Sequence, residues 1–192
     1  KILFVPTNGV GLGHAQRLGL IASSFGDQSS ISFAAFPSCI PMLNRYGFDS
    51  MALIGKSPKF SQPFANDVAN FQRISSFLTA GDTLVFDGGF IFDSVFQSCF
   101  IPDVRSVWVR RGMWQHQQSN DAVLSREKAF DLVISPSEAF DELNQSLSTG
   151  KNVHQVGPIV TSPGSTGFDV RNIRDNLKEK FGRDFDRLVV TM

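Results

Sequence analysis

Three glycines and a histidine near the start of the chain form the segment best suited to chemistry. Gly9, Gly11 and Gly13 follow the apolar run Ile2–Val5, and His14 comes directly after them, where a helical pattern begins. Glycines allow positive φ and let a ligand approach the backbone closely. A helix that starts there directs its unpaired N–H groups and the positive end of its dipole at the same place. The arrangement predicts a cradle for an anion or a sugar phosphate.

The spacing of these glycines does not fit a dinucleotide site. The fingerprint G-x-G-x-x-G needs a glycine at the sixth position counted from Gly9, and His14 stands there. The acidic residue that would bind a ribose at the end of the second strand is missing from Ala35–Ser38. We therefore predict no NAD site and no other cofactor. A glycine-rich first turn that serves packing alone is the structural alternative.

His14 is the candidate general base. Moving a sugar to a hydroxyl group or to water requires a base that removes a proton as the anomeric bond breaks, and imidazole suits this task near neutral pH. The helix N-terminus and Arg17 are expected to favour the neutral ring, and Asp87 is the candidate carboxylate that orients it. The structural alternatives are a helix-capping imidazole for His14 and a turn residue before two glycines for Asp87.

Substrate contacts are predicted on the first loop and at the ends of later strands. The predicted substrate-binding residues are Asn8, Gly9, Gly11, Gly13, Arg17, Arg110, Arg111 and Glu138. Arg17 lies one helical turn from His14 on the same face, and its planar guanidinium suits an acceptor phosphate or carboxylate. A surface ion pair is its structural alternative. Arg110 and Arg111 would point to opposite sides in strand geometry, so at most one is expected in the cleft.

Apolar runs alternate with helix-period segments, which predicts an α/β fold: a Rossmann-like, doubly wound parallel sheet of about seven strands with the first strand central. Strands are expected at Ile2–Val5, Ser30–Ala35, Ser50–Ile54, Thr83–Phe86, Ser106–Val109, Leu132–Ser135 and Val153–Val156. Helices are expected at His14–Phe25, Ile40–Tyr46, Asn66–Leu78, Phe92–Phe100, Ser119–Lys128 and Ser137–Leu147. With the common strand order 3-2-1-4-5, the fourth strand neighbours the first, which puts Asp87 beside the glycine loop and His14. His154 falls in a strand expected to be buried and is assigned a structural role.

The pattern G-x-G-x-G-H-x-x-R from Gly9 to Arg17, placed after a first strand, resembles the amino-terminal half of GT-B nucleotide-sugar enzymes. It is similar to the transferases that add N-acetylglucosamine to the lipid-linked peptidoglycan precursor, and to the nucleotide-sugar hydrolases of pseudaminic acid synthesis. The histidine after the glycines also resembles the base of plant and antibiotic glycosyltransferases, and Asp87 resembles their aspartate partner. Arg17 departs from the peptidoglycan enzymes and matches the hydrolases, so transfer and hydrolysis both stay open.

The resemblance implies that the chain is the acceptor-side half of a two-domain enzyme. In that family a Val-Gly-Pro turn closes the first domain, and residues 156–158 match it. We expect an acceptor-side domain over residues 1–160, then a linker and the truncated start of the donor domain over 161–192. The implied function is transfer of a sugar from a nucleotide-sugar donor, bound mostly by the other domain, to a sugar, lipid-linked or small-molecule acceptor hydroxyl. The alternatives are a nucleotide-sugar hydrolase or epimerase, or a binding domain without catalysis.

Two expectations about behaviour follow. The isolated chain should fold but give no turnover of nucleotide sugars, and residues 161–192 should be more mobile than the core. Replacing His14 or Asp87 should barely change thermal stability, because neither residue belongs to the apolar core.

Composition and charge argue against several protein classes. A hydrophobic content of 42% with 19% charged residues suits a buried core and argues against disorder. Lys plus Arg and Asp plus Glu number 18 each, which argues against broad nucleic-acid binding. Cys39 and Cys99 lack metal-like spacing and suggest free thiols in a reducing compartment, so no metal is predicted. No apolar run approaches the ~18 residues of a membrane helix, and no signal peptide opens the chain, so a cytoplasmic location is expected.

Overall fold

The computed structural model describes residues 1–7, 11–55, 63–110, 121–137, 150–160, 175–176, 178–180 and 182. The chain divides into two compact units, Lys1–Ile159 and Val160–Met192. The first unit contains all the strands and helices discussed below. In the second unit the described residues 175–176 and 178–180 are helical. The predicted linker and the predicted last strand at residues 187–192 lie outside the described residues.

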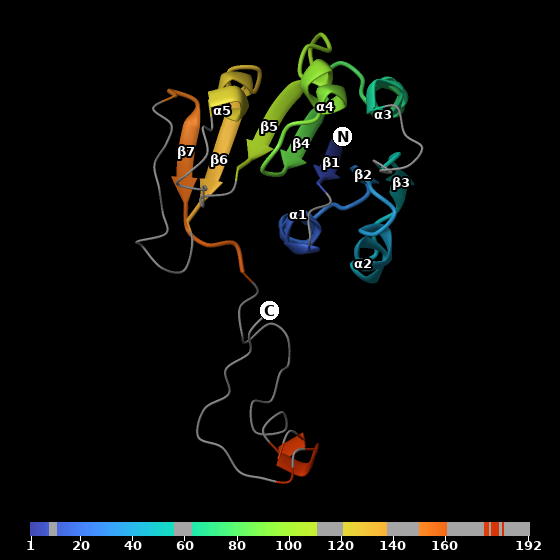
Figure 1. Ribbon diagram of the computed structural model, residues 1–192, viewed down its shortest axis with the longest axis vertical. Helices are drawn as coiled ribbons and strands as arrows, with labels where there is room; N and C mark the ends of the chain where they lie inside the picture. Colours follow the sequence, from blue (N-terminus) through green and yellow to red (C-terminus); the bar gives the residue numbers. More distant parts are fainter. Residues whose placement is uncertain are drawn as a thin grey trace. The chain divides into compact units, whose positions relative to one another are not determined.

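The first unit is built on one parallel sheet of seven strands (Figure 1). The strands are β1 Ile2–Pro6, β2 Ile31–Ala35, β3 Ser50–Ala52, β4 Thr83–Asp87, β5 Arg105–Val109, β6 Leu132–Pro136 and β7 Val153–Val156. Their spatial order is β3-β2-β1-β4-β5-β6-β7, and every neighbouring pair is parallel. The predicted α/β doubly wound sheet is therefore confirmed. All seven predicted strands are present, and β1 lies inside the sheet between β2 and β4.

Strand β3 is shorter than predicted for an identifiable reason. Beyond Ala52, the N–H of Leu53 still bonds the Ala35 carbonyl at 2.8 Å. At Ile54, however, the side-chain amide of Asn70 accepts from the backbone N–H at 2.8 Å and donates to the carbonyl at 3.0 Å. This side chain takes the place of a strand partner, so the ladder ends two residues early.

The helices in the described part of the chain are α1 Gly13–Ser23, α2 Ile40–Arg45, α3 Pro63–Phe77, α4 Asp93–Ser98 and α5 Asp121–Glu127. All five match predicted helices, with ends that differ by up to three residues. Helix α3 begins at Pro63 rather than Asn66, because a proline in the first helical turn loses no intrahelical hydrogen bond. The predicted helix Ser137–Leu147 lies outside the described residues from 138 onward.

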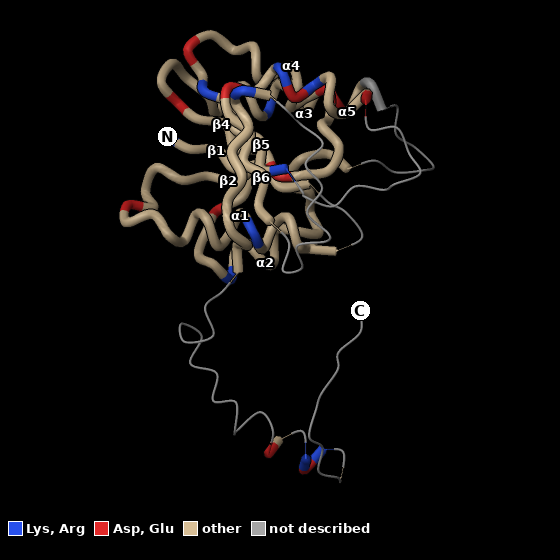
Figure 2. The backbone as a smooth tube through the Cα atoms, turned by 90° about the vertical axis from the view of Figure 1, so that its left-hand side faces the viewer, with Lys and Arg blue, Asp and Glu red and all other residues tan. Residues whose placement is uncertain are grey.

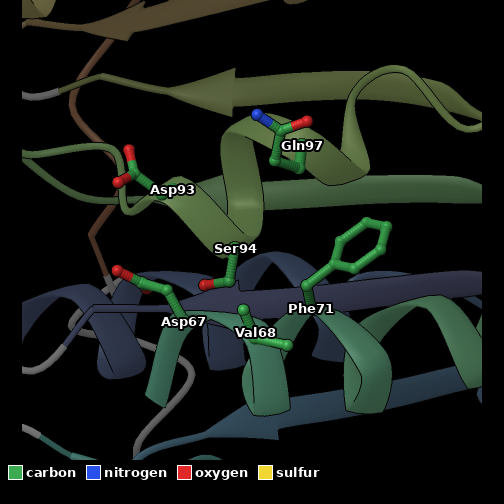
Figure 3. Close-up of a pocket in the computed structure, with 6 residues that line it drawn as sticks. All are labelled: Asp67, Val68, Phe71, Asp93, Ser94 and Gln97. Carbon is green, nitrogen blue, oxygen red and sulfur yellow. The ribbon is translucent and has the colours of Figure 1, made fainter. Parts of the chain in front are cut away.

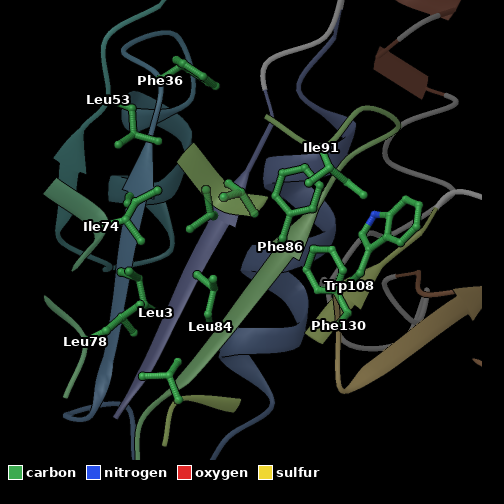
Figure 4. Close-up of a cluster of buried hydrophobic side chains, with 14 of the residues drawn as sticks. Leu3, Phe36, Leu53, Ile74, Leu78, Leu84, Phe86, Ile91, Trp108 and Phe130 are labelled. Atoms are coloured by element: carbon green, nitrogen blue, oxygen red, sulfur yellow. The ribbon is translucent and has the colours of Figure 1, made fainter. Parts of the chain in front are cut away.

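Two apolar layers cover the sheet, one on each face. On one face, Ile74 of α3 and Val95 of α4 pack with the sheet residues Leu3, Leu84 and Trp108, and α5 adds partly buried side chains (Figure 4). On the other face, α1 and α2 pack against Phe4 and Phe33 through a cluster that includes Ala15, Leu18, Ala22 and Leu43. Strands covered on both faces have continuous apolar runs, as Ile2–Pro6 of β1 and residues 84–86 of β4 do.

His154 is exposed rather than buried, because β7 is the edge strand of the sheet and most of its residues face solvent. Cys39 and Cys99 are free thiols, and burial raises the pKa of Cys99 to about 12. No helix in the described residues is long and apolar enough to cross a membrane. Figure 2 shows acidic and basic segments interspersed along the first unit.

Candidate functional site

The order of the strands identifies the place in the sheet where a ligand is expected. From β1 the chain builds outward through β2 and β3, then returns to place β4 on the other side of β1. The connections after β1 and β4 therefore diverge to opposite faces, and α1 packs on one face while α4 packs on the other. In open parallel sheets, ligands bind at the carboxyl ends of the strands at such a switch point.

Asp87 ends β4 at this switch point and is completely buried. It lies opposite Pro6 of β1 and Val109 of β5, and its carbonyl accepts a hydrogen bond from the Thr7 N–H at 2.8 Å. Its side chain is 0% exposed to solvent. A buried carboxylate is stable only when charged or polar partners surround it. The partners come from α1.

Arg17 and His14 both bond this carboxylate from one face of α1. Arg17 donates from Nε to Asp87 Oδ2 at 2.7 Å and from Nη2 to Oδ1 at 2.6 Å, a bidentate pair. His14 Nδ1 lies 2.7 Å from the same Oδ1. Because the two α1 residues are three positions apart, they lie on one face of the helix and reach the same acceptor. The predicted proximity of His14 and Asp87 is present in the structure.

The hydrogen bonds indicate which tautomer His14 adopts. Asp87 Oδ1 can only accept, so Nδ1 must carry a proton and donate it. The contact of 3.4 Å between Arg17 Nη2 and His14 Nδ1 then joins two N–H groups and adds no strong bond. In the neutral ring this leaves the lone pair on Nε2, which has no hydrogen-bond partner among the described residues. His14 is 22% exposed, so a ligand can reach its ring.

The backbone after Asp87 is held by two groups that the sequence did not point to. A Cβ at Gly88 would lie 2.3 Å from Thr7 Cγ2 and 2.8 Å from Phe86 Cζ, so only glycine fits there. The indole Nε1 of Trp108 donates to the Gly88 carbonyl at 2.9 Å. The absence of a side chain at Gly88 therefore makes room for the side chain of Thr7, which directly follows β1. The sequence signal for this close contact was the pair Gly88-Gly89, which does not identify the group that approaches the backbone.

Arg110 lies in a second, separate arrangement. It follows β5 and donates from Nη1 to Glu127 Oε2 at 2.7 Å, with the two side chains 2% and 8% exposed. Burial lowers the pKa of the Arg110 guanidinium, and the adjacent Glu127 carboxylate offsets part of that shift. Arg110 was predicted to bind substrate, and the structure instead pairs it with a buried acid.

Of the remaining predicted site residues, the structure describes Gly11 and Gly13 but not the other four. At Gly11 and Gly13 a Cβ would meet no atom within 4 Å, and neither glycine has a positive φ. The backbone conformation therefore does not require glycine at either position, although both leave the loop open to a ligand. Asn8, Gly9, Arg111 and Glu138 lie outside the described residues. Among the described residues, no group of three or more His, Cys, Asp or Glu side chains could hold a metal ion.

No known protein-family model matches the chain, and no curated protein is similar to it at a significant level.

Proposed function

We propose that the first unit is the acceptor-side domain of a GT-B glycosyltransferase, with His14 as the general base. The observation that carries the proposal is the bond from His14 Nδ1 to the buried Asp87, which directs the basic Nε2 away from the carboxylate. Nε2 of a neutral imidazole can remove the proton of an acceptor hydroxyl as the bond from the sugar to the nucleotide breaks. The carboxylate then stabilises the imidazolium that forms.

Arg17 has a positioning role in this proposal. Its bidentate bond fixes both carboxylate oxygens of Asp87, so Oδ1 presents a constant acceptor to His14. This role differs from the acceptor contact suggested by the sequence. The donor would be a nucleotide sugar held mainly by a second domain, and the acceptor would be a sugar, a lipid-linked sugar or a small hydroxyl compound.

Kinetics in the two-domain enzyme that the proposal implies can test it. The parent enzyme, His14→Ala and the matched control His154→Ala would be incubated with UDP-, TDP-, GDP- and CMP-sugars, and release of free nucleotide would be measured with and without added acceptors. We expect His14→Ala to lower kcat by roughly 10²–10⁴, the usual contribution of one general base. His154 is exposed on the edge strand, so its replacement should leave kcat unchanged.

The same assay separates transfer from hydrolysis, because a transferase forms a glycosylated acceptor, whereas a hydrolase releases free sugar at an equal rate without any acceptor. A His14→Ala enzyme with near-normal kcat would refute the assignment of the base. The isolated chain is predicted to give no turnover, and tight binding of a UDP-sugar to it in calorimetry would count against the division into acceptor and donor domains.

A further inference from the structure

A pocket of ≈ 260 Å³ lies between α3 and α4 (Figure 3). It is lined by Asp67, Val68, Phe71, Asp93, Ser94 and Gln97. Helices α3 and α4 cover the face of the sheet opposite α1, so this pocket shares no residue with the His14 site. Its volume is slightly below the usual range of small-molecule sites, which suits a compact ligand.

Carboxylate and hydroxyl groups line one side of this pocket and apolar side chains line another, and the Gln97 amide of α4 is a further polar group. Figure 3 shows the carboxylates of Asp67 and Asp93 at one side with the Ser94 hydroxyl beside them, and the Phe71 ring at the other side. Val68 extends the apolar wall. A ligand that matches both parts has one polar head and one apolar body.

The Ser94 hydroxyl is the buried polar group that points to a ligand. The residue is 4% exposed, and its Oγ forms no hydrogen bond with any described residue. Ser98, one turn later, bonds its Oγ to the Ser94 carbonyl at 2.7 Å. Ser94 cannot do the same, because it is the second residue of α4 and the residue four positions earlier lies outside the helix. The hydroxyl group is therefore available to hydrogen-bond a ligand in the pocket that Ser94 lines.

The charged side chains around the pocket determine which charge a ligand should carry. Asp93 pairs with Arg126 at 2.6 Å, whereas Asp67 forms no ion pair with any described residue. Two carboxylates and one guanidinium leave one negative charge at the polar end. The dipole at the start of α4 favours an anion, but Asp93 already occupies that position as the first residue of the helix. One uncompensated carboxylate at the polar side suits a single cationic head group, and the Phe71 ring at the other side suits an apolar body.

We propose that this pocket binds a small organic monocation, a primary amine with an apolar body. The ammonium group donates to the Asp67 carboxylate and to Ser94 Oγ, and the apolar body packs on Phe71 and Val68. This site is independent of the proposed sugar transfer, and its test requires no enzymatic activity.

The test uses 2-phenylethylammonium chloride as the probe, with the 192-residue chain followed by two-dimensional amide NMR. We expect saturable shifts at residues 67–71 and 93–97, with a Kd of roughly 0.1–1 mM for a ligand of about nine heavy atoms. The neutral isostere 2-phenylethanol should bind about tenfold more weakly or worse, because it lacks the charge. Equal binding of the alcohol, tighter binding of the anion 3-phenylpropanoate, or the absence of saturable shifts would each overturn the proposal.

Two variants and a matched control locate the binding. Asp67→Asn and Ser94→Ala should each raise the Kd of the amine about fivefold or more, since each removes one polar contact to the ammonium. Ser94→Ala should leave the melting temperature unchanged, because the hydroxyl has no hydrogen bond within the described protein. Asp49→Asn removes the same charge at an exposed position outside the pocket and should leave the Kd unchanged. Binding by both pocket variants with the parent Kd would refute the site.

Discussion

Two arginine–carboxylate pairs lie near the carboxyl ends of the central strands, and they differ in what surrounds them. In the first, Arg17 bonds Asp87 at 2.6 and 2.7 Å, and His14 shares the same carboxylate. In the second, Arg110 bonds Glu127 at 2.7 Å. The distances are alike, so the ion pair by itself does not distinguish a structural role from a functional one.

The two pairs differ in solvent access and in whether a third side chain joins the arginine and the carboxylate. Arg17 and His14 are 19% and 22% exposed, and His14 adds a side chain that can exchange a proton. Arg110 is sealed, and its guanidinium lies 5.9 Å from the centre of the Trp108 ring. Trp108 in turn bonds the Gly88 carbonyl, next to Asp87. The buried pair of Arg110 and Glu127, which we call the sealed pair, therefore supports the backbone next to Asp87. The partly exposed pair of Arg17 and Asp87, which we call the open pair, depends on this backbone.

The largest effect is expected where the sealed pair is broken. Glu127→Ala leaves the Arg110 charge buried without its carboxylate, which typically costs about 3–5 kcal/mol of folding free energy. Urea unfolding followed by circular dichroism measures this, with Asp49→Ala as an exposed control expected to change stability by less than about 0.5 kcal/mol. A loss below 1 kcal/mol for Glu127→Ala would mean that water reaches Arg110 and that the pair is not sealed.

A smaller loss is expected at the open pair. Asp87→Asn keeps the shape but removes the charge that two α1 side chains share, at a cost of about 1–3 kcal/mol for a buried, charge-assisted network. The sequence led us to expect almost no change, because Asp87 is not apolar. Its complete burial corrects that expectation. Nitrogen NMR of the parent His14 ring should show the proton of the neutral ring on Nδ1, and a neutral ring protonated on Nε2 alone would contradict the proposed hydrogen bond.

The close packing beneath the open pair gives a third test. Gly88→Ala places a methyl group 2.3 Å from Thr7 Cγ2, and such overpacking typically costs about 1–3 kcal/mol. Gly11→Ala is the matched control, since a Cβ there meets nothing within 4 Å and φ is not positive. Equal melting temperatures for the two variants would show that the strand ends shift freely and that Asp87 is not rigidly held.

The sequence predicted the sheet well because apolar runs between helical segments are a local signal. It also predicted that His14 and Asp87 meet, since the common strand order places the fourth strand beside the first. It did not predict which arginine reaches Asp87. Arg17 lies in the helix that follows β1 and Arg110 directly follows β5, so the topology brings both towards the same edge of the sheet, and the packing of α1 and α5 decides which carboxylate each one reaches.

Contacts between residues distant in the sequence account for the features of the fold and the site that the sequence did not predict. The bond from Trp108 to the Gly88 carbonyl and the replacement of a strand partner at Ile54 by Asn70 join positions 20 and 16 residues apart. No periodicity encodes such contacts. The exposure of His154 was missed for a related reason, because an edge strand and a buried strand can have the same apolar composition, and β7 is at the edge.

The smallest expected effect on stability is at His14, and this makes it the variant that best separates a catalytic role from a structural one. In His14→Ala, Asp87 Oδ1 keeps its bond from Arg17 at 2.6 Å, so the buried carboxylate is not left without a partner. The lost imidazole is partly exposed, and alanine favours helix more than histidine does, so the net change should be under about 1 kcal/mol. Asp87→Asn lowers stability whether or not the site is catalytic, and its loss of rate alone is therefore ambiguous. His14→Ala should combine a nearly unchanged melting temperature with the large fall in kcat given above. If its melting temperature falls as far as that of Asp87→Asn while kcat is preserved, the open pair is a second structural anchor of α1, and the contrast with Arg110 and Glu127 no longer indicates function.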